Sequence, residues 1–78
     1  MQTTIFRTTD KGNTRYYQMS MEQTLFNTFL VERKYGNVNY KSHTGLKIDY
    51  FDELEQAQTF YDKMLKNKAK KGYINETR

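Results

Sequence analysis

The chain has 78 residues and a formal net charge of +4, and it contains neither cysteine nor proline. Disulfide bonds are therefore excluded, and one core of this size supplies only about 3–5 kcal/mol of net stability. Seven Tyr and five Phe supply the large side chains that such a core needs. No apolar run is long enough to cross a bilayer, and no leader resembles a secretion signal. We therefore expect one small cytoplasmic domain without membrane contact.

Two strands joined by a turn are predicted for the first 22 residues. Residues 3–8 are rich in β-branched and aromatic side chains, and residues 10–13 (Asp-Lys-Gly-Asn) have the composition of a turn. Residues 15–22 alternate in polarity, which is typical of a strand with one buried face. The side chains expected on that buried face are Tyr17, Met19 and Met21.

A central strand is predicted for residues 28–35, which carry an apolar run in their first half. Residues 23–27 form the connection before it, where we expect Leu25 and Phe26 to hold the chain against the core. Gly36 is expected to end this strand, at a backbone position that only glycine adopts comfortably. Residues 39–45 then read as an exposed loop.

The final strand and a helix follow. Leu46, Ile48 and Tyr50 alternate with Lys47 and Asp49, which predicts a short strand.

Residues 52–71 have apolar side chains at spacings of three and four, as one face of a helix requires. We expect Asp52 and Glu55 to form a capping box at the start of the helix. At its end, Gly72 supplies a left-handed stop and Tyr73 folds back on the last turn. The side chains of the helical stripe are Leu54, Ala57, Tyr61, Met64, Leu65 and Lys68.

These elements predict an α+β fold. Short connections favour an antiparallel meander of about four strands, with the one C-terminal helix packed across one face of the sheet. The domain is expected to span residues 1–73, and residues 74–78 are expected to form a frayed tail. The sheet side chains predicted to meet the helix are Met19, Met21, Phe29, Val31 and Ile48.

The whole pattern resembles the WGR domain, a small module of poly(ADP-ribose) polymerases that also occurs in bacterial proteins. Residues 5–6 and 15–19 look like its opening strands, and Lys68, Gly72 and Tyr73 match its Lys-x-x-x-Gly-Tyr ending. The Trp-Gly-Arg signature falls on residues 35–37, which read Tyr-Gly-Asn here. The resemblance implies a nucleic-acid contact near Tyr35, but loss of the signature Arg implies poor recognition of DNA ends.

The expected function is non-catalytic nucleic-acid binding through the strand-rich part of the chain. Residues 1–48 hold seven basic and three acidic side chains, so the positive excess lies there. Tyr35 would stack on a base or sugar, and the basic residues would neutralise phosphates. The nucleic-acid-binding residues predicted in this way are Arg33, Lys34, Tyr35, Asn37, Lys41 and Lys47.

An alternative function is protein docking without nucleic acid, which the polymerase WGR domains also suggest. In that case the residues that matter most are Glu32, Asn37 and the face that carries Tyr16.

No enzymatic or metal site is predicted. The chain has one histidine, His43, and no cysteine, which argues against zinc. Capping explains the carboxylates of Asp52, Glu53 and Glu55 without a catalytic role. No phosphate loop or nucleophile–base pair is present, so we expect no cofactor, no small-molecule substrate and no catalysis.

Overall fold

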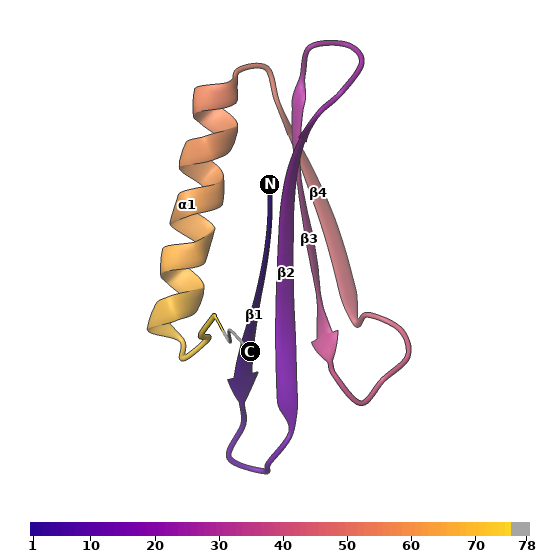
Figure 1. The fold of residues 1–78 in the computed structure, drawn as a ribbon, viewed down its shortest axis with the longest axis vertical. Coiled ribbons are helices and arrows are strands. Elements are labelled where there is room, and N and C mark those ends of the chain that lie inside the picture. Colours follow the sequence, from indigo (N-terminus) through magenta and orange to yellow (C-terminus); the bar gives the residue numbers. More distant parts are fainter. Residues whose placement is uncertain (76–78) are drawn as a thin grey trace.

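The computed structural model describes residues 1–75 as one antiparallel sheet and one helix (Figure 1). The strands lie side by side in chain order, and each pairs antiparallel with the next. This arrangement confirms the predicted α+β fold with a four-stranded meander. The elements are β1 (Gln2–Thr8), β2 (Thr14–Gln23), β3 (Phe29–Asn37), β4 (Gly45–Phe51) and α1 (Leu54–Lys70).

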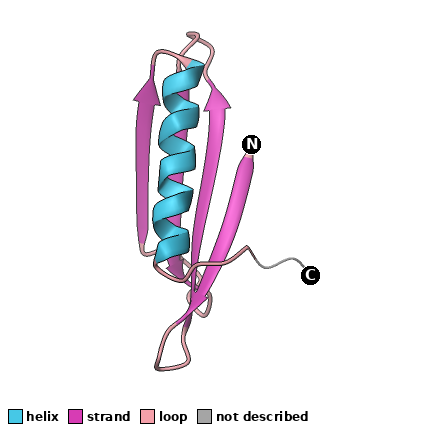
Figure 2. Ribbon diagram, turned by 90° about the vertical axis from the view of Figure 1, so that its left-hand side faces the viewer, coloured by secondary structure: helices cyan, strands magenta, loops and turns pink. Residues whose placement is uncertain are grey.

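The helix covers one face of the sheet, which we call the inner face (Figure 2). Side chains of successive strand residues point to opposite faces, so the register Ile5–Tyr17–Tyr35 places these three residues on the same, inner face. The other face, called the outer face here, is not covered by the helix (Figure 1). The buried core is small and consists of Ile5, Tyr17, Met19, Val31, Ala57 and Tyr61.

The helix is held against β2 and β3 by two side chains one turn apart. Ala57 is 0% exposed and Tyr61 is 2% exposed. The Tyr61 hydroxyl also donates a 2.7 Å hydrogen bond to Oγ1 of Thr3 on β1, so its polar end is satisfied where the ring is buried. Met64 and Leu65 pack against the same cluster and are half-buried, as predicted from their spacing.

Three residues of the strands and turns were wrongly expected to pack in the core. The register pairs Val31 with Asp49, so β4 turns its odd-numbered residues to the inner face. Ile48 therefore lies on the outer face, 43% exposed, instead of in the core. Leu25 and Phe26 are 98% and 87% exposed at the β2–β3 turn; the turn is held by Thr24 and Thr28 instead, whose hydroxyls lie 2.7 Å apart.

The helix begins differently from the prediction and ends as predicted. Its N-cap is Glu53, which makes no side-chain capping bond, so the capping box at Asp52 and Glu55 was wrong. Leu54, in the first turn, was expected to pack on the sheet but is 53% exposed. At the other end Gly72 has φ of +97° and the Tyr73 N–H donates to the Lys68 carbonyl, which is a Schellman stop. Within residues 1–75 no helix is long and apolar enough to cross a membrane.

The chain after the helix returns to the sheet. Phe6 and Ile74 exchange two backbone hydrogen bonds of 2.9 and 2.8 Å, which form a bridge on the free side of β1. The expectation of a frayed tail is therefore wrong at Ile74. The last three residues of that tail, 76–78, lie outside the described residues.

Gly36 is required for a steric reason and not for the backbone reason predicted. It lies within β3, pairs with Tyr16, and is not among the glycines with positive φ. A Cβ placed on Gly36 would lie 2.9 Å from the backbone nitrogen of Thr44. A backbone atom cannot move aside cheaply, so the β3–β4 loop closes over a position without a side chain.

Met19→Ala is expected to lower the free energy of unfolding by about 2–5 kcal/mol, because Met19 is 0% exposed and its loss leaves a cavity. Leu25→Ala removes a similar side chain from a 98% exposed position and should change the free energy of unfolding by less than about 0.5 kcal/mol. Urea unfolding followed by circular dichroism measures both. Equal losses in the two variants would contradict the core described here.

Gly36→Ala should destabilise the domain by about 1–3 kcal/mol, because the added methyl group forces the Thr44 backbone outward. Ser20→Ala, on the outer face of the neighbouring strand, serves as the control and should cost less than about 0.5 kcal/mol. Thermal unfolding of the two variants compares them. A fully stable Gly36→Ala protein would show that the loop has another low-energy path.

Candidate nucleic-acid interface

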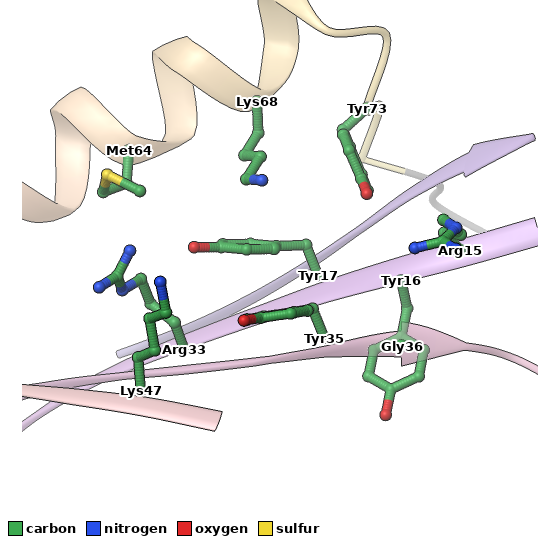
Figure 3. Close-up of a pocket in the computed structure, with 10 residues that line it drawn as sticks. All are labelled: Arg15, Tyr16, Tyr17, Arg33, Tyr35, Gly36, Lys47, Met64, Lys68 and Tyr73. Atoms are coloured by element: carbon green, nitrogen blue, oxygen red, sulfur yellow. The ribbon is translucent and has the colours of Figure 1, made fainter. Parts of the chain in front are cut away.

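A cleft of about 310 Å³ opens between the last turns of α1 and the inner face of the sheet (Figure 3). Side chains from β2, β3, β4 and α1, and one residue after the helix, line it. Basic and aromatic residues make up most of the lining. The lining residues are Arg15, Tyr16, Tyr17, Arg33, Tyr35, Gly36, Lys47, Met64, Lys68 and Tyr73.

Three side chains form a stack through the centre of the cleft. The Tyr17 and Tyr35 rings are nearly parallel, with centroids 5.7 Å apart. On the opposite side of Tyr17 lies the Lys68 amino group, 4.3 Å from the ring centroid (Figure 3). Tyr73 meets Tyr17 edge-on at 6.2 Å, and its own ring centroid is 5.5 Å from the Lys68 nitrogen. Lys68 is thus held by two aromatic rings, an arrangement that stabilises a cation by about 0.5–2 kcal/mol.

The cleft has a strongly positive character. Arg15, Arg33, Lys47 and Lys68 all line it, and within the described part of the chain no Asp or Glu does. Arg33 is partly neutralised, because it makes a 2.9 Å ion pair with Asp49; its guanidinium also lies 5.2 Å from the centroid of the Phe60 ring. Clefts lined by charges of one sign raise the local concentration of oppositely charged ligands.

The protonation of Lys68 reflects this crowding of positive charge. Burial lowers the pKa of its amino group, and repulsion from Lys71, Arg33 and Lys47 lowers it further. Burial has the opposite effect on the neighbouring hydroxyl, raising the pKa of Tyr17, while the Arg33 guanidinium opposes that rise. An anion in the cleft would relieve the repulsion on Lys68.

The structure brings together only part of the residue set predicted from the sequence. Arg33, Tyr35 and Lys47 line the cleft. Lys34 lies between two inner-face residues of β3 and therefore points to the outer face. Asn37 accepts a 2.9 Å hydrogen bond from the Asn39 N–H, so its side chain shapes the start of the loop.

The remaining member of the set, Lys41, is exposed in the loop between β3 and β4 and does not line the cleft.

Tyr35 is less open to stacking than the sequence implied. One face of its ring lies against Tyr17. A Cβ at Gly45 would overlap the ring atoms and hydroxyl of Tyr35, so this ring rests directly on the glycine. Gly45 is the strand partner of Tyr35, and its missing side chain leaves the space that the ring fills.

Seven of the ten lining residues were not among the predicted binding residues. The four of them that add basic groups or packed aromatic rings to the cleft are Arg15, Tyr17, Lys68 and Tyr73. Lys68 carried a usable signal, because it occupies the last position of the apolar helical stripe. A lysine in that position must face the sheet, but Lys68 was not included among the predicted binding residues.

A family model for the WGR domain matches residues 1–78. The chain belongs to the WGR domain family. An uncharacterised protein of Sinorhizobium fredii (strain NBRC 101917 / NGR234), y4dW, is 34% identical over 59 residues, which is 76% of this chain and 28% of that protein. The chain therefore corresponds to less than a third of the length of this relative. No solved structure gives a significant match.

In this WGR domain the signature positions run along β3 beside the cleft. Tyr35 and Gly36 line the cleft, and Asn37 is the last residue of β3. The Lys-x-x-x-Gly-Tyr ending supplies the other wall: Gly72 turns the chain so that Lys68 and Tyr73 both meet Tyr17. The two sequence features that carry the resemblance to the family therefore meet at one site.

The Lys68 amino group is expected to titrate below the ordinary lysine value of 10.5. An anion favours the charged form, so adding inorganic phosphate should raise the pKa of Lys68; by linkage, anion affinity falls as pH rises through that pKa. Lys47→Ala should also raise it, because a repelling charge is removed. Titration of the lysine Cε resonances by NMR measures these shifts. A Lys68 that titrates at 10.5 or above would contradict the electrostatics of the cleft.

Proposed function

We propose that this WGR domain is a non-catalytic module that binds nucleic acid in the cleft between α1 and the inner face of the sheet. The observation that carries the proposal is the convergence of four basic side chains around a tyrosine stack, without a lining carboxylate in residues 1–75. Phosphates are the anionic groups that such a site attracts most directly. Family membership agrees with a binding role.

Each part of the cleft has a role in this proposal. Lys47 and Lys68 approach from opposite walls, one on β4 and one on α1, and neutralise phosphates between them. Arg15, exposed on β2, extends the positive surface toward the β1–β2 turn. Arg33 contributes less charge because Asp49 pairs with it.

The tyrosines shape the cleft and hold Lys68 in place. Since Tyr35 is packed between Tyr17 and Gly45, the half-buried ring of Tyr73 is the better candidate to touch a sugar or base. Stacking of a base on such a ring contributes about 1–3 kcal/mol and does not depend strongly on sequence. Binding is therefore expected to be dominated by charge and to discriminate weakly between sequences.

A second candidate function, protein docking, is favoured by the β2–β3 turn. Leu25 and Phe26 are neighbouring apolar side chains that are 98% and 87% exposed. Exposed apolar pairs of this kind are typical of protein contacts. The cleft lies at the last turns of α1, whereas the β2–β3 turn lies beyond the start of α1 (Figure 1). Docking at the turn and binding in the cleft would therefore use different ends of the sheet.

Duplex DNA binding should weaken steeply with salt, with a log–log slope of about −3 to −4 for three or four phosphate contacts. Lys47→Ala and Lys68→Ala should each flatten the slope by about one unit. Lys34→Ala removes the same charge from the outer face and should leave the slope nearly unchanged. Fluorescence anisotropy across a salt series, with duplex and single strands, makes the comparison.

Equal effects of the three substitutions would place the binding surface outside the cleft. Absence of binding at low salt would favour protein docking instead.

A further inference from the structure

The two edges of the sheet differ. On the β1 side, Ile74 bonds to Phe6 and closes part of the edge. On the β4 side, no residue in 1–75 pairs with the outer edge of this seven-residue strand. Open strand edges accept a further strand, and natural proteins usually block them with charged side chains, a bulge, a proline or a covering segment. β4 has no proline and no covering segment in residues 1–75, and its two charged residues, Lys47 and Asp49, have opposite signs and can therefore complement each other across an antiparallel pair.

The hydrogen-bond pattern identifies the backbone groups on the open edge. Backbone groups of alternate residues point to opposite sides of a strand. The Val38 N–H donates to the Thr14 carbonyl, in register with β2, so the even-numbered residues of β3 point to β2 and the odd-numbered ones to β4. Odd-numbered residues of β3 pair with odd-numbered residues of β4. The N–H and C=O groups that point to the open edge therefore belong to Leu46, Ile48 and Tyr50.

We propose that a second copy of this chain occupies the edge, through an antiparallel β4–β4 pair with its two-fold axis at Ile48. Each Leu46 then faces Tyr50 of the other copy and Ile48 faces Ile48, so the free N–H and C=O groups of both edges bond reciprocally. Lys47 of each copy lies beside Asp49 of the other, on the inner face. The proposal does not rest on nucleic-acid binding.

The charges of Lys47 and Asp49 favour the register centred on Ile48 over the registers centred on either adjacent residue. Moving the axis to Lys47 would place two lysines directly opposite each other, and moving it to Asp49 would oppose two aspartates. Like charges in directly opposite positions are unfavourable, whereas opposite charges are favourable. The Lys47–Asp49 positions are also the non-hydrogen-bonded ones, where side chains lie closest. The strand Leu-Lys-Ile-Asp-Tyr is therefore self-complementary about its centre.

The surroundings of β4 accommodate a second copy. Leu46, Ile48 and Tyr50 are 45%, 43% and 66% exposed on the outer face, and pairing would join them into one apolar strip. In the joined sheet the two β3 strands are three strand spacings apart, about 14 Å. Helices centred over β3 would therefore clear one another, since packed helices need only about 8–10 Å. Both clefts would open on the same face of one continuous sheet.

Sedimentation velocity and amide exchange test the pairing directly. Between about 1 µM and about 1 mM the protein should pass from monomer to dimer. Over the same range the amides of Leu46, Ile48 and Tyr50 should become protected from exchange, because they are free only in the monomer. A monomer at every concentration would overturn the proposal, as would a dimer in which these amides stay unprotected.

Proline substitutions in β4 and in β1 test which edge of the sheet forms the dimer. Ile48→Pro removes an N–H on the open edge, where strands tolerate proline, and should give a folded monomer. Thr4→Pro removes an outward N–H of β1 and should still dimerise. Should Ile48→Pro fail to fold, Lys47→Glu opposes two acids across the axis and should weaken dimerisation about tenfold, while Lys11→Glu in the β1–β2 turn should not. Dimerisation that is unaffected by Lys47→Glu would overturn this register.

Discussion

The contact of Ala57 and Tyr61 with Met19 and Val31 is the interaction on which the rest of the structure depends. A four-stranded sheet has two faces, and this chain has one helix to cover one of them. The methyl side chain of Ala57 lets the helix approach the sheet closely, while Tyr61 fills the adjoining space and bonds to Thr3. Without this contact neither layer has a second layer to bury against.

The same contact creates the cleft. One and two turns beyond Tyr61, the helical side chains that face the sheet are Met64 and Lys68, and both line the cleft. Lys68 meets Tyr17, which is 3% exposed and belongs to the core as well as to the site. The residues that stabilise the domain and those that hold positive charge in the cleft therefore form one continuous cluster.

Periodicity predicted the strands, the helix and the closing Gly72 turn, because each depends on local spacing. Periodicity did not predict which face of β4 meets the helix. The alternation of residues 46–50 shows two different faces, but only the pairing of β4 with β3 shows that Ile48 lies on the outer one. The predicted binding residues do not all line the cleft for a local reason, since adjacent residues such as Arg33 and Lys34 point to opposite faces of a strand. The contact of Lys68 with Tyr17 joins two residues that are far apart in the sequence, and no local pattern identifies Tyr17 as the partner.

Chemical-shift mapping tests most directly whether the cleft is the binding surface. A short DNA duplex is added to isotope-labelled protein at low salt, and backbone and aromatic resonances are followed. The account predicts that the largest changes occur at Tyr17, Lys68 and Tyr73, with little change at Lys34 on the outer face. Changes centred on Leu25 and Phe26, or on the outer face, with the cleft unaffected, would contradict it.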